Sequence, residues 1–300
     1  MTEHFRQLDQ SLGSLCNTLD VLAGPTQVTL VGVRYQDDPG LLEQCLSVLT
    51  PAEQSRSTQL GAPGARSRFI QRRALGHWLA QVVGNFDGLG NPSGTDRNTA
   101  TGLGDVTHYS VTSTACSAIY ALSQDSPVGI DAEPPDPTAP VLDLAKTHFS
   151  PAETAALASL PPGKQIDEFF RMWRLKEACL KFQGQGLSNG LDRWCLLRDP
   201  QGHLWLENKQ PADLSTVAFK PALYETTFMG LALGLVVAAR LGDVNPSRTA
   251  TAIPLDPPRN SAASNVPGLL ERRRQSLPGL SPPPDPAHTP NPVRSHKTGS

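Results

Sequence analysis

The feature that most constrains how this chain can fold is a pattern that occurs twice, about 100 residues apart. Thr50–Glu53 (TPAE) and Ser150–Glu153 (SPAE) are both capping boxes, in which a hydroxyl begins a helix and a glutamate follows three residues later. Each follows a strand-like Val-Gly-Val or Val-Gly-Ile segment and precedes a longer helical segment. Three landmarks in nearly one register indicate an internal duplication, with chance recurrence of common capping chemistry as the alternative.

We therefore expect an α+β fold of two similar α/β lobes related by a pseudo-twofold axis, with ligands binding between them. We place an N-terminal extension at residues 1–26, the N-terminal lobe at 27–127 and the C-terminal lobe at 128–242. Residues 243–300 hold 12 of the 28 prolines and no aromatic residue, Met or Cys. Such a segment has too little apolar surface to offset its ordering entropy, so we expect a disordered tail.

Local patterns predict the elements of each lobe. Helices are expected at residues 1–22, 38–49, 66–83 and 169–182, and a further helix from the capping box at 150–153. Strands are expected at 27–35, 108–114, 117–122, 128–133, 194–198, 203–207, 215–220 and 228–239. Residues 84–105, rich in Gly, Asn, Thr and Asp, are expected to form a loop.

Charge and cysteine content exclude several classes of protein. The chain has 26 Lys and Arg against 28 Asp and Glu, which gives no overall attraction to nucleic acid or to anionic membranes. Its five cysteines include no CxxC pair, which favours reduced thiols in a cytoplasmic protein. The charged N-terminus is unlike a signal peptide, and the longest apolar run, Phe228–Ala239, is too short to span a bilayer.

The stretch Phe169–Leu187 predicts a helix that is apolar on two sides, as buried helices are. It nevertheless carries Glu177 and Lys181, which are one helical turn apart. Buried charges are costly unless they pair with each other, a metal or a ligand. A single internal ion pair is one interpretation, and a ligand site is the other.

Two further carboxylates favour the ligand site. Asp131 and Glu133 lie two residues apart in a predicted strand and are expected to point the same way. With Glu177 they form a set of hard oxygen ligands that suits Mg²⁺ and its phosphate-bearing substrates. A solvated strand end is the alternative for Asp131 and Glu133. The cations expected near this cleft are Lys176, Lys181, Arg68 and Arg73. The chain lacks a GxxxxGK[ST] loop, so it is not a P-loop enzyme.

These motifs resemble those of the 4'-phosphopantetheinyl transferase superfamily. Val128–Glu133 (VGIDAE) matches the family's (V/I)G(V/I)D-x-E, and Trp173–Lys181 (WRLKEACLK) matches its W-x-x-KE-(A/S)-x-x-K. The spacing of about forty residues between them also fits, as does the Gly184-x-Gly186 turn after the helix. The resemblance covers roughly residues 27–240 and is to the larger, two-lobed, surfactin-synthetase-activating type.

The resemblance implies a monomer that binds coenzyme A and Mg²⁺ between its lobes. Such an enzyme moves the phosphopantetheine arm to a serine of an apo acyl or peptidyl carrier protein and releases adenosine 3',5'-bisphosphate. It implies that Asp131, Glu133 and Glu177 hold the metal, and that Glu177 or a metal-bound water is the general base. The residues expected to contact coenzyme A are Lys181, Lys176, Arg56, Arg68, Arg73, Thr112 and Ser113.

One departure from the family concerns the coenzyme side of the predicted site. Where the family usually has a Ser-His-Ser segment, this chain has Thr112-Ser113-Thr114, so Ser113 replaces a cationic side chain. Three hypotheses follow: a Mg²⁺-dependent transferase, an impaired homologue that binds coenzyme A or a carrier protein without turnover, and an unrelated Mg²⁺-dependent phosphate enzyme with convergent carboxylates. Transfer to a carrier distinguishes the first from the second, and coenzyme A binding distinguishes the third.

Overall fold

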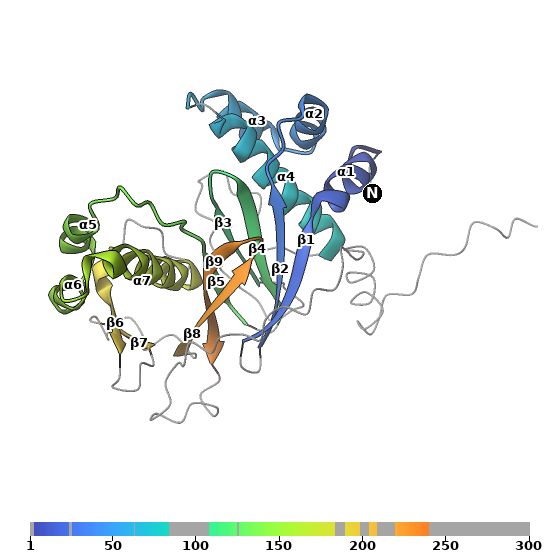
Figure 1. Cartoon of the computed structure of the whole chain (residues 1–300). Helices are drawn as coiled ribbons and strands as arrows, with labels where there is room; N and C mark the ends of the chain where they lie inside the picture. The colour runs from blue at the N-terminus through green and yellow to red at the C-terminus, as the bar shows by residue number, and fades with distance from the viewer. Residues whose placement is uncertain are drawn as a thin grey trace, which may run out of the picture.

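The computed structural model describes residues 3–23, 26–62, 64–83, 108–124, 126–183, 190–198, 204–208 and 220–239. Four features predicted from the sequence lie outside these ranges: the loop at 84–105, the Gly184-x-Gly186 turn, the strand at 215–220 apart from Lys220, and the tail at 243–300. In the described part, helices α5, α6 and α7 lie on one side of the molecule and helices α1 to α4 on the other, with strands between them (Figure 1). This mixture of helices and sheets confirms the α+β class.

The N-terminal part is built on a four-stranded antiparallel sheet with the strand order β1-β2-β4-β3. Strands β2 and β4 are almost continuously buried because apolar clusters cover both of their faces. Its elements are α1 (Glu3–Leu15), β1 (Asn17–Ala23), β2 (Thr26–Arg34), α2 (Pro39–Ser47), α3 (Pro51–Thr58), α4 (Ala65–Val83), β3 (His108–Ser113) and β4 (Ser117–Ser123).

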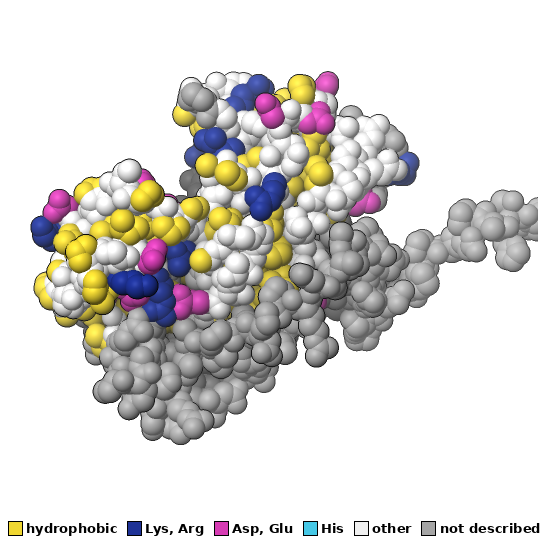
Figure 2. All heavy atoms as spheres, in the orientation of Figure 1, with side chains coloured by type: hydrophobic (Ala, Val, Ile, Leu, Met, Phe, Trp, Pro, Cys, Tyr) yellow, Lys and Arg dark blue, Asp and Glu magenta, His cyan; other side chains and the backbone are white. Residues whose placement is uncertain are grey.

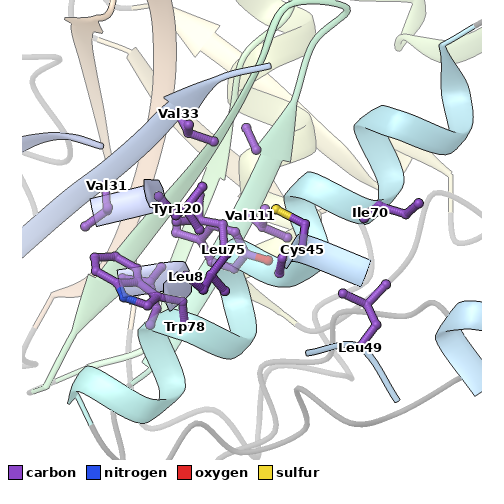
Figure 3. Close-up of a cluster of buried hydrophobic side chains, with 14 of the residues drawn as sticks. Leu8, Val31, Val33, Cys45, Leu49, Ile70, Leu75, Trp78, Val111 and Tyr120 are labelled. Atoms are coloured by element: carbon purple, nitrogen blue, oxygen red, sulfur yellow. The ribbon is translucent and has the colours of Figure 1, made fainter. Parts of the chain in front are cut away.

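The predicted helix at residues 1–22 is correct only as far as Leu15, because the chain then turns into the edge strand β1. Helix α1 docks on α4 through a hydrogen bond from Trp78 Nε1 to Asp9 Oδ1, 2.8 Å long. Leu8 and Leu12 are fully buried in the same apolar core as Trp78 (Figure 3). Residues 3–23 therefore complete the sheet and core of this lobe.

The C-terminal part has a three-stranded antiparallel sheet with the order β5-β9-β8 and a separate hairpin of β6 and β7. The predicted single strand Phe228–Ala239 is wrong at its start, because the chain reverses at Met229 and Gly230, both at positive φ. Its elements are β5 (Val128–Asp131), α5 (Val141–His148), α6 (Pro151–Ala158), α7 (Pro162–Phe182), β6 (Trp194–Arg198), β7 (Leu204–Asn208), β8 (Lys220–Phe228) and β9 (Leu231–Ala239).

Both predicted capping boxes are present, and each glutamate also forms a buried ion pair. Glu53, at the start of α3, pairs with Arg73 of α4 and lies 2.8 Å from His77 Nε2. Glu153, at the start of α6, accepts bonds of 2.9 and 2.8 Å from Lys176 Nζ of α7. Each short helix is thus fixed to the long helix that follows it by the residue that also caps it.

Replacing Glu53 with glutamine is expected to lower the free energy of unfolding at pH 7 by about 3 kcal/mol. Burial alone would raise the pKa of Glu53. The bonds from His77 and the Thr50 backbone, with the charge of Arg73, outweigh burial and lower the pKa from 4.5 to about 2. The stabilisation is therefore present above pH 4.5 and is lost as the pH falls towards 2. Denaturant unfolding of both proteins at pH 7 and pH 3 measures it, and a pH-independent difference would contradict the assignment.

The two lobes share an apolar core and a hydrogen-bonded seam. Side chains of β1, β2 and β4 pack with those of β5, β8 and β9 in a single buried cluster. At the seam the backbone N–H groups of Ile130 and Ala132 donate to the hydroxyls of Ser110 (3.1 Å) and Thr112 (3.0 Å). Strand β5 is therefore held against β3 through side-chain hydroxyls.

No helix in the described ranges is long and apolar enough to cross a membrane. All five cysteines are unpaired, as the sequence predicted, and Cys45, Cys179 and Cys195 are buried.

Candidate active site

Helix α7 forms the floor of the candidate site, and from Arg174 to Leu180 every residue is buried. Two glycines allow the strands to approach it closely. A Cβ on Gly129 of β5 would lie 2.0 Å from the Ala178 carbonyl oxygen, and one on Gly234 of β9 would lie 2.9 Å from the Arg174 carbonyl oxygen. Only glycine therefore fits at position 129 of the VGID motif, because it lets the end of β5 pack closely against α7.

Asp131 is the last residue of β5 and is buried at the seam between the lobes. Its Oδ1 accepts a bond of 2.7 Å from Lys181 Nζ and one of 3.2 Å from Thr112 Oγ1. Its Oδ2 is buried and has no hydrogen-bond partner among the described residues. A buried carboxylate oxygen without a partner costs free energy, so this atom is free to bind an incoming cation.

Glu133 and Glu177 lie in the electrostatic field of Asp131. Burial, and next the charge of Asp131, raise the pKa of Glu177 from 4.5 to about 7. Burial and Asp131 also raise the pKa of Glu133. The predicted strand at 128–133 is too long, because β5 ends at Asp131. Glu133 is exposed and lies in irregular structure, so it does not share a strand face with Asp131. The three carboxylates are nevertheless close enough to repel one another.

These observations test whether the site suits a divalent cation. In the described part of the chain, no three His, Cys, Asp or Glu side chains already have an arrangement that could hold a metal ion. The donor set nevertheless fits Mg²⁺, which prefers carboxylate oxygens and retains several waters. The unpartnered Asp131 Oδ2 and the mutual repulsion of three carboxylates are both features that a bound cation would relieve.

Two of the predicted cations have structural roles. Lys176 is completely buried between Glu153 and the ring of Phe149, 4.5 Å from the ring centroid, so its predicted contact with phosphates is wrong. Arg73 is buried in the corresponding pair with Glu53, which contradicts its predicted contact with the coenzyme. Lys181 does reach the site, where its ammonium pairs with Asp131 and is partly exposed.

Charges on the N-terminal side gather around Tyr35. Burial is the main effect on the Tyr35 hydroxyl and raises its pKa, while Arg72, Ser113 and Arg68 act in the opposite direction. Arg68 and the exposed Ser113 thus lie near one group, and Arg72, which the sequence patterns did not single out, lies with them. Arg56 is further along, with its guanidinium 5.9 Å from the centroid of the Phe69 ring.

The surface between the lobes is notched, and basic and acidic side chains lie side by side on the C-terminal lobe next to this notch (Figure 2). Asp131 and Thr112 form a hydrogen bond between the two lobes.

Thr112 holds Asp131 rather than facing a ligand, because its buried hydroxyl already bonds both Asp131 and the Ala132 N–H. Replacing Thr112 with valine, which has the same shape, is expected to cost about 1–3 kcal/mol of unfolding free energy. It is also expected to lower activity about tenfold, as loss of a group that orients a metal ligand does. Thr112→Ser keeps the hydroxyl and is the control; equal losses in both variants would contradict this role.

Fold and site together define an α+β protein of two lobes with a carboxylate cluster and a lysine at the seam. Residues 127–233 match the family model of the 4'-phosphopantetheinyl transferase superfamily. The matched range contains Asp131, Glu133, Glu177 and Lys181. The match argues against convergence of an unrelated phosphate enzyme.

Several curated proteins are similar to the chain. It is 32% identical over 156 residues to the 4'-phosphopantetheinyl transferase HetI of a Nostoc species, covering 49% of this chain and 64% of that protein. It is 38% identical over 101 residues to the transferase psf-1 of Bacillus pumilus, covering 33% of this chain and 42% of the relative. It is 31% identical over 100 residues to Sfp of Bacillus subtilis, covering 33% of this chain and 43% of that relative. The chain thus spans between about two fifths and two thirds of the length of these relatives.

Proposed function

We propose that this chain transfers the 4'-phosphopantetheine arm of coenzyme A to a serine of an apo acyl or peptidyl carrier protein, releasing adenosine 3',5'-bisphosphate. The observation that carries the proposal is the cluster of Asp131, Glu133 and Glu177. They come from two distant segments, lie within each other's electrostatic field and fall at the motif positions of the matched range. Transfer between phosphates needs this concentration of metal-binding oxygens more than it needs a covalent nucleophile.

The proposed reaction forms a bond between the serine oxygen and a phosphorus of the coenzyme A pyrophosphate. The bond from that phosphorus to the bridging oxygen breaks, and the bisphosphate leaves with the electron pair. Asp131, Glu133 and Glu177 would hold Mg²⁺, which supplies charge neutralisation for the leaving group. Glu177 would accept the serine proton as general base.

Cations from both lobes would bind the phosphates. Lys181, whose partly exposed ammonium pairs with Asp131 Oδ1, would contact the pyrophosphate. Arg68 and Arg72, near Tyr35 and Ser113, supply positive charge on the N-terminal side. The proposed coenzyme contacts are thus Lys181, Arg68, Arg72 and Ser113, with Arg56 at the edge.

We also propose that the lobes arose by duplication, that they meet at the predicted boundary between residues 127 and 128, and that α1 and β1 form part of the N-terminal lobe. The strand orders β2-β4-β3 and β5-β9-β8 correspond, with three helices following the first strand of each. The ion pairs Glu53–Arg73 and Glu153–Lys176 occupy corresponding helices. A monomer that acts in the cytoplasm stays a prediction.

Intact-mass analysis tests the activity. The full chain is incubated with coenzyme A, Mg²⁺ and several apo acyl and peptidyl carrier proteins, with EDTA in a parallel set. We expect one carrier to gain the mass of one phosphopantetheine on its serine, and EDTA to prevent it. If coenzyme A binds but no carrier is modified, the chain is instead a binding homologue without turnover.

Ser113 motivates that second function, because serine brings no charge to a position where the family usually has histidine. Replacing Ser113 with histidine is expected to keep or raise activity, lowering KM for coenzyme A by about 2- to 10-fold through one added hydrogen bond to phosphate. Steady-state kinetics at varied coenzyme A concentration measure this. A large loss of activity would show that Ser113 has a role that histidine cannot replace.

A further inference from the structure

Arg174 occupies a variable position of the family motif, between Trp173 and Leu175, and it is buried at the junction of α7 and the sheet. Its Nη1 donates to the backbone carbonyl of Glu133 over 3.2 Å. Glu133 lies beyond the end of β5 and belongs to none of the described strand pairs. The bond from Arg174 therefore ties this irregular segment to the helix that carries Glu177.

The sheet register explains why the arginine fits there. Asp131 pairs with Gly234, and Gly234 pairs with Glu225, so the three lie in one row across β5, β9 and β8. Partners directly opposite one another in antiparallel strands point to the same face. Gly234 in the middle has no side chain, and the Arg174 backbone packs against it. Arg174 thus lies over the gap between two carboxylates, and both interact electrostatically with it.

From this geometry we propose that Arg174 is a positioning residue of the active site, which holds the backbone of Glu133 so that its carboxylate faces Asp131 and Glu177. This rests on the proposed metal site. The charge of Arg174 also offsets part of the repulsion among the three carboxylates in the metal-free protein. A guanidinium suits this position because its planar group reaches a carbonyl and keeps its charge when buried.

Arg171 provides a matched control. It lies one turn earlier on α7 and makes two bonds from Nε, of 2.8 and 2.9 Å, to the carboxylate of Glu225. It has the same charge but is more exposed than Arg174, and its partners are the carboxylates of Glu225 and Glu168. Arg171→Met therefore removes a cation from the same helix without releasing the segment after β5.

The experiment compares wild type, Arg174→Met, Arg174→Lys and Arg171→Met as full-length proteins. Mn²⁺ is the probe, titrated calorimetrically without coenzyme A. We expect Arg174→Met to weaken Mn²⁺ binding by about 10- to 100-fold, as loss of a group that supports a metal ligand does. Arg174→Lys is expected to lose less, and Arg171→Met to stay within about twofold of wild type. Arg174→Lys replaces Arg174→Met if the latter does not fold.

A second measurement does not depend on the metal. Hydrogen–deuterium exchange of the segment after Asp131 is expected to be faster in Arg174→Met than in wild type, and unchanged in Arg171→Met. Unchanged exchange, or equal weakening of Mn²⁺ binding in both methionine variants, would overturn the proposal. If wild type binds Mn²⁺ and Arg174→Met does not, yet no carrier is modified, the positioning role stands and the transferase function fails.

Discussion

Replacing Glu177 with glutamine is expected to lower the rate of phosphopantetheine transfer by about 10²- to 10⁴-fold, the usual contribution of a general base. The variant also loses one of three proposed metal ligands. Intact-mass analysis of the carrier over time measures the rate. Because glutamine keeps the size of the side chain, the helix and its packing are expected to remain.

The matched control is Glu168→Gln, on the same helix. Glu168 lies 3.6 Å from Arg171 and is outside the carboxylate cluster, so activity is expected to stay near that of wild type. Retained activity in Glu177→Gln would show that another group takes the serine proton and that the metal assignment is wrong. Equal losses in both variants would point to a general effect of charge on α7.

The stability of Glu177→Gln separates loss of chemistry from loss of fold. The folded-state pKa of Glu177, about 7, is above its ordinary value of 4.5. Folding is therefore favoured by the protonated form, and this contribution is lost as the pH rises from 4.5 through 7. Glutamine stays neutral, so the metal-free variant is expected to melt at a higher temperature than wild type at pH 8. At pH 4 the two are expected to melt at similar temperatures.

Replacing Gly129 with alanine is expected to lower the free energy of unfolding by at least about 3 kcal/mol, above the usual cost of overpacking. The added Cβ would lie 2.0 Å from the Ala178 carbonyl oxygen and 2.7 Å from the Phe182 backbone nitrogen. Both are backbone atoms of α7, which cannot move aside as a flexible side chain can. The strand must then separate from the helix, which displaces Asp131. Denaturant unfolding measures the effect.

Gly163→Ala is the control for this change. Gly163 is exposed near the start of α7 and an added Cβ there would meet no atom within 4 Å. Alanine has a higher helix propensity than glycine, so this variant is expected to gain up to about 1 kcal/mol. If Gly129→Ala is as stable as wild type, the strand is not held against α7 as the structure describes.

The local features of this fold could be predicted from the sequence because they depend on neighbouring residues. Both capping boxes begin helices where expected, since each needs only a hydroxyl and a glutamate three residues apart. Asp131, Glu177 and Lys181 were likewise identified by spacing within two short motifs. The structure then places Lys181 against Asp131 and raises the pKa of Glu177 through burial and Asp131.

The features that the sequence did not predict depend on contacts between residues far apart in the chain. Lys176 and Arg73 looked like phosphate ligands because a sequence shows charge and not burial, and only the fold pairs them with the capping glutamates. The role of Arg174 could not be predicted from the sequence, because its hydrogen-bond partner is a backbone carbonyl 41 residues away. Strand β1 was missed because its apolar residues are interrupted by Asp20, which accepts a bond from Thr29 across the pair.

The seam of hydroxyls between β3 and β5 has a consequence for cooperativity. Ser110 and Thr112 satisfy amide groups of the other lobe, and the apolar cluster behind them draws side chains from both lobes. Cutting the chain at the lobe boundary would leave these donors unpaired and this surface in water, so neither half is an independent folding unit. Heat or denaturant would thus unfold both lobes in one transition, and the carboxylate cluster would be lost in that same transition.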